Sequence, residues 1–170
     1  MKYKHWIHTR KPVRIIPTKW YFSPWPKRVP VQLEQMPVVF WLLLKDVVWN
    51  INYAPYIVST YLDINPAIVV EMNAGRVIAL FNHIRSQVEK CNKSYEWAMM
   101  DLLPIGSDVD NSHFQGIENL AIIYDLMSYG NKTLKEAEQI TFSEAISYLK
   151  IKNAYIRSDQ NRYLKNKTKK

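Results

Sequence analysis

The cluster of side chains best suited to hold a cation lies at residues 108–113 (DVDNSH), where oxygen ligands stand at alternate positions. A calcium loop between two helices requires glycine at its sixth position and glutamate at its twelfth. Counted from Asp108, these positions hold His113 and Asn119, so the calcium pattern fails. We interpret the segment as a solvated loop that caps the following helix, and we predict no metal site.

Catalytic chemistry finds little support in the remaining polar residues. His5 and His8 have no acidic neighbour to orient them, and His83 falls within an expected helix. The four glycines are isolated, so no phosphate-binding loop is present, and no nucleophile is flanked by glycines. The single cysteine, Cys91, excludes an intramolecular disulfide and indicates a small buried or half-buried side chain. We predict no enzyme, no catalytic residue and no cofactor.

Cations and aromatic rings alternate near the N-terminus, at residues 2–6 (KYKHW) and 19–21 (KWY). Such segments can follow phosphates and stack on bases, or lie in an acidic, apolar groove of another protein. A third possibility is that they fold back over the chain's own core. We favour a protein partner, and the residues expected to bind it are Trp6, Arg10, Lys11, Arg14, Lys19, Trp20, Tyr21, Phe22, Trp25, Lys27 and Arg28.

Charge is distributed unevenly along the chain. Residues 1–30 carry eight Lys/Arg and no acidic residue, and residues 151–170 carry seven basic residues and one acidic one. The 120 residues between hold eight basic and fourteen acidic side chains. Like charges repel, so we expect both ends to extend until an acidic or concave surface receives them. Nucleic acid stays open as the partner of both basic ends.

The first 30 residues indicate an extended arm, because five of the nine prolines lie there and each removes a backbone donor. The hydrophobic content of 48% is typical of a globular chain, and 170 residues suit one domain. The longest apolar run, residues 38–44, is too short to cross a membrane. No apolar segment follows the charged N-terminus, so we expect no secretory signal. A membrane partner is not expected.

The pattern between the two basic ends predicts helices. A buried helix is expected over residues 37–50, with a strand over 38–44 as the alternative. We find no internal repeat and no sustained heptad pattern. Further helices are expected over residues 55–62, from Asn65-Pro66, over 74–90, over 117–129, after Thr133 and from Thr141 to about Arg157. In the helix over 117–129, one face is expected to hold Ile117, Leu120, Ala121 and Tyr124. In the last helix, the side chains expected to point inward are Phe142, Ala145, Ile146 and Leu149.

Two capping boxes begin the last helices, at residues 133–136 (TLKE) and 141–144 (TFSE). Residues 133–145 resemble the closing helices of small tail-assembly and virion-structural proteins of tailed bacteriophages. The resemblance implies a non-enzymatic component of a particle, present in several copies around a symmetry axis, and it carries over no catalytic residue. It also implies the virion or the host cytoplasm as the location.

These observations predict a mainly α fold: a single helical domain at residues 31–157, an extended Pro/Trp-rich arm at 1–30 and a basic tail at 158–170. The predicted function is that of a structural subunit of a large assembly, a phage virion, neck or tail component, anchored to neighbouring protein subunits by its arm. Self-association into a homo-oligomer stays open. The alternative is an RNA- or DNA-binding subunit of a nucleoprotein complex.

Overall fold

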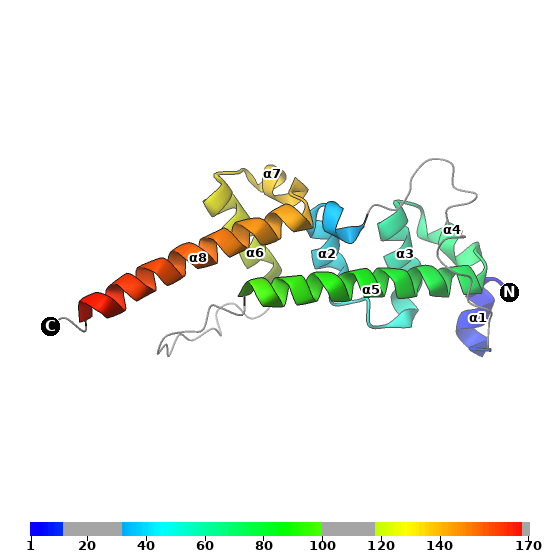
Figure 1. Cartoon of the computed structure of the whole chain (residues 1–170). Coiled ribbons are helices and arrows are strands. Elements are labelled where there is room, and N and C mark those ends of the chain that lie inside the picture. Colours follow the sequence, from blue (N-terminus) through cyan, green and yellow to red (C-terminus); the bar gives the residue numbers. More distant parts are fainter. Residues whose placement is uncertain (12–31, 100–117, 168–170) are drawn as a thin grey trace. The chain divides into compact units, whose positions relative to one another are not determined.

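The computed structural model describes residues 1–11, 32–99 and 118–167, and this part of the chain is mainly helical (Figure 1). It holds no β-strand within these ranges, so the predicted mainly α class is confirmed. The elements are α1 (Tyr3–Thr9), η2 (Leu33–Gln35), α2 (Val38–Leu44), η3 (Ile51–Tyr53), α3 (Ala54–Leu62), α4 (Pro66–Glu71), α5 (Ala74–Met99), α6 (Glu118–Gly130), α7 (Leu134–Gln139) and α8 (Phe142–Lys167).

The chain divides into two compact units, Met1–Cys91 (unit 1) and Asn92–Lys170 (unit 2), and the boundary falls inside helix α5. This division differs from the single domain expected at residues 31–157. The described residues also differ from the expected domain limits at residues 31 and 157. Residues 1–11 belong to unit 1, and helix α8 continues past residue 157.

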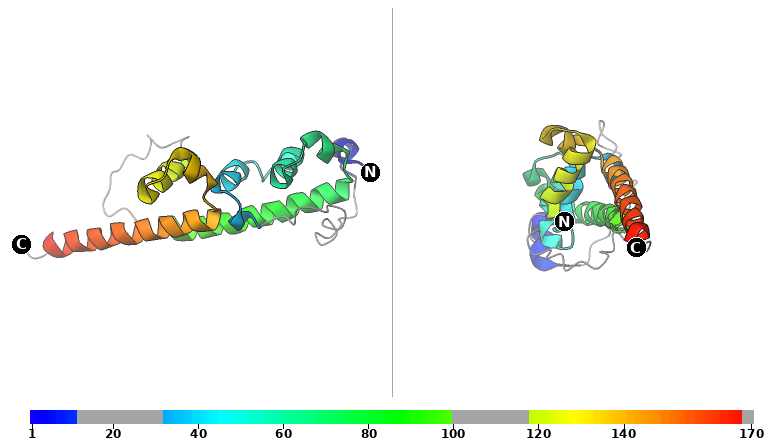
Figure 2. Two further views of the ribbon diagram at one scale, coloured as in Figure 1. Left: turned by 90° about the horizontal axis from the view of Figure 1, so that it is seen from above. Right: turned by 90° about the vertical axis from the view of Figure 1, so that its left-hand side faces the viewer.

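The core of unit 1 forms where helices α2, α3 and α4 pack along one side of α5 (Figure 2). Buried positions of α5 recur every three or four residues, which is the period of a helix with one face inward. Cys91 is buried, as expected. The core side chains from α5 are Val77, Leu80, Phe81, Ile84, Val88 and Cys91, and those from α2 and α3 include Val38, Trp41, Leu44, Ile57, Val58 and Tyr61.

Proline and asparagine mark the starts of two helices in unit 1. The strand alternative for residues 38–44 is wrong, since they form α2, and this helix ends at Leu44 rather than near residue 50. Helix α3 begins with a first-turn proline as predicted. Asn65 caps α4, because its side-chain oxygen accepts a hydrogen bond of 2.8 Å from the Ala67 amide.

The start of the chain is not an extended arm over the residues that the structure describes. Residues 3–9 form helix α1, which packs against α4. No proline precedes Pro12, so nothing in this segment prevents a helix, and an aromatic side chain anchors it to the core. The rest of the predicted arm, residues 12–30, lies outside the described residues.

Unit 2 is built from α6, α7 and α8, together with the end of α5. Phe142, Ala145, Ile146 and Leu149 are buried, as the sequence predicts. Tyr124, expected on one face with Ile117, Leu120 and Ala121, is 68% exposed, whereas α6 buries Ile122, Ile123 and Leu126. Ile117 and the side chain of Leu120 lie outside the described part of the chain. Apolar residues lie on more than one side of this helix, and packing on α7 and α8 selects the side that is buried.

Both predicted capping boxes are present. The Thr133 hydroxyl accepts from the Glu136 amide at 3.4 Å, while the Glu136 carboxylate accepts from the Thr133 amide at 2.8 Å. Thr141 and Glu144 repeat the exchange at 3.3 and 3.0 Å. Each box satisfies amide groups that have no partner inside the helix.

Helix α8 runs ten residues beyond its expected end at Arg157, so the predicted tail is helical as far as Lys167. A buried Asn153 anchors its middle, because the side-chain amide donates to the Ala98 carbonyl at 2.6 Å. An ion pair of 2.5 Å between Lys152 and Asp125 joins α8 to α6. Residues 168–170 lie outside the described part. No helix of the described ranges combines the length and apolarity needed to cross a membrane.

The second capping box gives a direct test of how α8 begins. Thr141→Ala removes the hydroxyl that caps α8 and should lower the free energy of unfolding by about 1 kcal/mol. Thr141→Ser keeps a hydroxyl and should stay within about 0.5 kcal/mol of the unmodified chain. Urea unfolding followed by circular dichroism measures both variants. Equal losses in the two would contradict the assigned role of the cap.

Candidate functional site

A main-chain bridge places helix α1 on unit 1. Lys2 pairs with Asn73 in an isolated antiparallel bridge. The Tyr3 amide donates to the Met72 carbonyl at 2.9 Å, and the Ala74 amide donates to the Met1 carbonyl at 2.8 Å. These bonds fix the start of α1 at the junction between α4 and α5.

Tyr3 then anchors the helix to a second element. Its side chain is 2% exposed, and its hydroxyl donates to the Ile51 carbonyl at 2.7 Å. Burial raises the pKa of Tyr3, and the positive charge of Arg10 opposes that shift. The phenol therefore stays protonated and keeps donating across the physiological pH range. Helix α1 is thereby held against η3, which begins at Ile51.

Two lysines add an electrostatic clamp beside this anchor. Lys2 Nζ lies 2.6 Å from Glu71 Oε2, and Lys4 bonds the other oxygen of the same carboxylate. The hydrogen bonds from Lys2 and Lys4 lower the pKa of Glu71 to about 2. The carboxylate is therefore ionised at neutral pH, and two cations of the basic segment at the N-terminus are already paired within unit 1.

The anchored helix presents an ordered arginine. The Arg10 guanidinium lies 4.9 Å from the ring centroid of Trp6, which is a cation–π distance. Arg10 also donates to the Asn52 side-chain oxygen at 2.6 Å, and Trp6 Nε1 donates to the Lys11 carbonyl at 2.8 Å. One face and one edge of the guanidinium are thus held in place. Its remaining N–H groups can bind an oxyanion.

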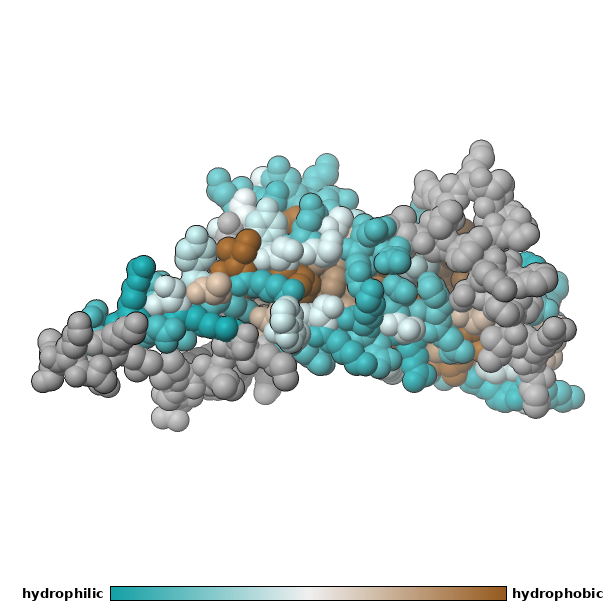
Figure 3. All heavy atoms as spheres, in the orientation of Figure 1, coloured by the Kyte–Doolittle hydropathy of each residue, from teal (hydrophilic) through white to brown (hydrophobic). Residues whose placement is uncertain are grey.

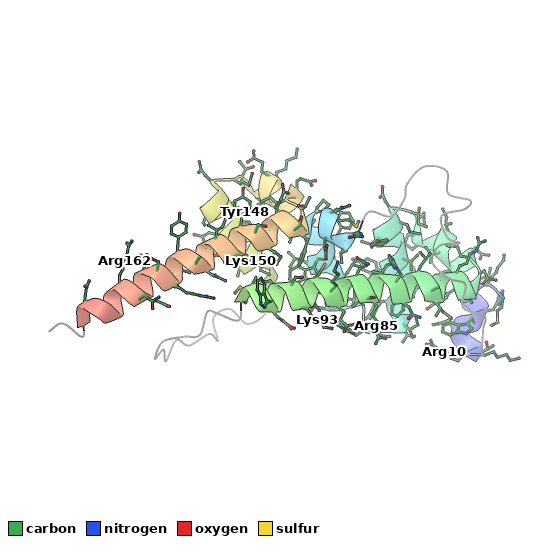
Figure 4. All side chains as sticks on the ribbon, in the orientation of Figure 1. Arg10, Arg85, Lys93, Tyr148, Lys150 and Arg162 are labelled. Carbon is green, nitrogen blue, oxygen red and sulfur yellow. The ribbon has the colours of Figure 1, made fainter. Side chains whose placement is uncertain are left out.

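A second arginine and two more exposed rings also lie in unit 1. Trp49 is 51% exposed, and the Arg85 guanidinium lies 5.6 Å from its ring centroid. Tyr53 is 49% exposed and adjoins Asn52. Figure 4 shows Arg10 and Arg85 on the same lower side of unit 1. We name this set the Arg–Trp surface: Trp6, Arg10, Trp49, Asn52, Tyr53 and Arg85.

The structure describes three of the eleven residues predicted to bind a partner. Trp6 and Arg10 are brought together, whereas Lys11 contributes its carbonyl to Trp6. The spacing of four between Trp6 and Arg10 predicts such a stack once residues 3–9 are known to be helical. Sequence reasoning missed Trp49, Asn52, Tyr53 and Arg85. Arg14, Lys19, Trp20, Tyr21, Phe22, Trp25, Lys27 and Arg28 lie outside the described residues, and their role stays a prediction.

Tryptophan and cation are paired throughout the described part of the chain. Besides Trp6 and Trp49, Trp41 has Lys45 at 5.7 Å and Trp97 has Lys150 at 4.3 Å from the ring centroid. All four tryptophans within the described ranges therefore carry a cation over the ring. The pairs orient basic side chains without neutralising them, so the cations remain able to bind anions.

A hollow of about 280 Å³ in unit 2 offers less for chemistry. Its two carboxylates, Glu136 and Glu144, hold the capping boxes, and hydrogen bonds from Thr133 and Thr141 lower their pKa values. They stay ionised at neutral pH and are poor proton donors. The lining consists of Lys132, Glu136, Gln139, Ile140, Glu144 and Tyr148.

Two further titratable side chains of helix α5, Cys91 and His83, are shifted away from reactive protonation states by burial. Burial raises the pKa of Cys91 to about 12, so its thiol stays protonated and a weak nucleophile. Burial lowers the pKa of His83, whose ring meets Tyr61 edge-on at 6.3 Å. Within the described ranges, no three His, Cys, Asp or Glu side chains are grouped to hold a metal ion. Residues 108–113, the predicted solvated loop, lie outside those ranges.

Comparison of the chain with protein-family models, with curated proteins and with solved structures gave no match. The function proposed for this chain therefore rests on the geometry of the Arg–Trp surface.

The clamp on Glu71 predicts that acid releases helix α1. The ordinary pKa of Glu71 is 4.5 and its folded pKa is about 2. Its contribution to docking is therefore complete above about pH 4.5 and is lost as the pH falls toward 2. The difference in tryptophan emission between the unmodified chain and Trp6→Phe reports this release during an acid titration.

Glu71→Gln supplies the control, because the amide keeps the shape of the side chain and cannot titrate. We expect the acid-dependent change at Trp6 to disappear in this variant. An unchanged transition in Glu71→Gln would show that another group controls the docking of α1.

Proposed function

We propose that this chain is a non-enzymatic structural subunit of a large assembly, and that the Arg–Trp surface of unit 1 binds an acidic patch on a neighbouring protein subunit. The observation that carries the proposal is the fixed Arg10 guanidinium, held by Trp6 and Asn52 before any partner arrives. An ordered side chain loses less entropy on binding than a free one. Arginine, tryptophan and tyrosine are also the residue types that dominate binding at protein interfaces.

The pairing of the lysines favours protein over nucleic acid as the partner. Lys2 and Lys4 bind Glu71, and Lys90 binds Glu34 at 2.8 Å. Nucleic-acid binding relies on many cations that neutralise successive phosphates, and these lysines are engaged inside unit 1. Bases also need open ring faces, whereas arginines cover one face of Trp6 and one of Trp49.

The resemblance of residues 133–145 implies that the assembly is a tailed-phage particle, and we include this assignment in the same proposal. The eight predicted partner-binding residues outside the described ranges would extend the same interface along the chain. Like charges over residues 12–30 would keep that segment apart from the basic start of the chain until a neighbour covers it.

The proposal is tested with two fluorescent probes of known composition. The protein probe is an acidic glutamate–tyrosine copolymer, and the nucleic-acid probe is an oligothymidylate. We expect Arg10→Ala in the full chain to weaken binding of the copolymer about tenfold, as loss of a charged interface anchor does. Anisotropy titration measures both probes.

The matched control removes a cation elsewhere on unit 1. Lys90→Ala deletes an exposed lysine that pairs with Glu34, and it should change copolymer binding less than about twofold. Equal effects of Arg10→Ala and Lys90→Ala would show that total charge decides binding. Preferential binding of oligothymidylate that weakens steeply with salt would support the nucleic-acid alternative instead.

A further inference from the structure

The outward face of helix α8 carries a line of exposed residues, with the half-buried Tyr148 among them, at coiled-coil spacing. Tyr155 is 68% exposed and Ile151 is 56% exposed. Figure 3 shows apolar atoms at the surface over the middle of α8, and Figure 4 places Tyr148 and Arg162 along its upper edge and Lys150 below it. The steps along this line alternate between four and three residues, through Glu144, Tyr148, Ile151, Tyr155, Ser158 and Arg162.

This line lies opposite the face that α8 buries in unit 2. The buried residues Phe142, Ala145, Ile146, Leu149 and Asn153 follow their own helical period. With 100° between successive residues, the exposed line falls on the other side of the helix. It spans fewer than three heptads, which is shorter than the stretch by which a sequence reveals a coiled coil. The sequence therefore gives no heptad signal here, although the folded helix presents one.

The two ends of the line carry opposite charges at equal distances from its centre. The line begins with an acid, Glu144, continues with Tyr148, Ile151 and Tyr155, and ends with a base, Arg162. Turning a copy of the helix end over end places Arg162 opposite Glu144 and Tyr155 opposite Ile151. The apolar residues then meet in the middle, and opposite charges meet at both ends.

We propose that α8 pairs with α8 of a second copy of this chain, antiparallel about a two-fold axis at the level of Asn153. The contact is self-complementary, as a two-fold interface requires. It extends about 27 Å from Glu144 to Arg162 at 1.5 Å per residue. Each copy supplies both halves of the contact, so the Glu144–Arg162 pair forms twice, while Oε2 of Glu144 continues to accept from Thr141 in the capping box.

Charge selects this orientation over the parallel one. A parallel pair would place Glu144 beside Glu144 and Arg162 beside Arg162, and like charges directly opposed weaken pairing. In the single chain, Arg162 has a 3.8 Å contact with Asp159, and both side chains are more than three-quarters exposed. That contact is weak and can be exchanged for a partner's carboxylate.

The residues beside this line are small enough for two α8 helices to approach each other closely. Ser147, Ala154 and Asn161 border the line on one side and are short. The pairing uses no residue of the Arg–Trp surface, so it stands apart from the proposed binding of an acidic neighbour. Binding on unit 1 and pairing through unit 2 can therefore succeed or fail separately.

Sedimentation equilibrium of the full chain tests the pairing. We expect a reversible dimer with a dissociation constant on the order of 10 µM, because the apolar centre is small. Tyr155→Arg should raise that constant at least about tenfold, since it places a cation against the apolar Ile151 of the second copy at the centre of the interface. Tyr124→Arg is the matched control, because Tyr124 is also 68% exposed but lies on α6, and it should change the constant less than about twofold.

Engineered cysteines test the orientation. A mixture of Glu144→Cys and Arg162→Cys chains should form a disulfide between copies under mild oxidation, whereas Arg162→Cys alone should not. The native Cys91 does not interfere, because it is buried. A monomer at about 100 µM, equal effects of Tyr155→Arg and Tyr124→Arg, or self-linking of Arg162→Cys alone would each overturn the proposal.

Discussion

The buried hydroxyl of Tyr3 is the contact on which the arrangement of unit 1 depends. It joins helix α1 to the Ile51 carbonyl, while the neighbouring main chain pairs with Met72 and Ala74. Without these contacts α1 is a seven-residue helix, too short to persist in water alone. Arg10 reaches Asn52 only because α1 is docked beside η3, so the part of the Arg–Trp surface formed by Trp6, Arg10 and Asn52 depends on burying one phenol.

Pairing of cations with indole rings explains how an aromatic-rich chain leaves large rings at its surface. Trp97 is 64% exposed, yet Lys150 lies 4.3 Å from its ring centroid. Each such pair covers one face of the ring with a side chain that stays hydrated. The rings and cations are thereby ordered within each unit. The two contacts that we propose lie on different units: arginines of unit 1 would bind an acidic protein, and the outer line of α8 in unit 2 would bind a second copy.

Local signals in the sequence were sufficient for the helices and their caps. Thr133, Thr141 and Asn65 cap the helices predicted from them, since capping depends on residues only two or three positions apart. The docking of α1 could not be predicted, because Tyr3 meets a carbonyl 48 residues away. The exposure of Tyr124 on α6 was not predicted for a related reason, since packing on α7 and α8 determines which side of that helix is buried. Four of the six residues of the Arg–Trp surface were missed for the same reason, since a pair such as Arg85 and Trp49 meets only in the folded chain.

Native-state hydrogen exchange at the amides of Tyr3 and Ala74 tests the docking of α1 most directly. Ala74 opens helix α5, where an amide has no partner inside the helix, so its protection depends on the Met1 carbonyl. If α1 is docked as described, both amides exchange together and at least about 100-fold more slowly than in an unfolded chain. Exchange of both at the unfolded rate, with the amides in the middle of α5 still protected, would contradict the docking.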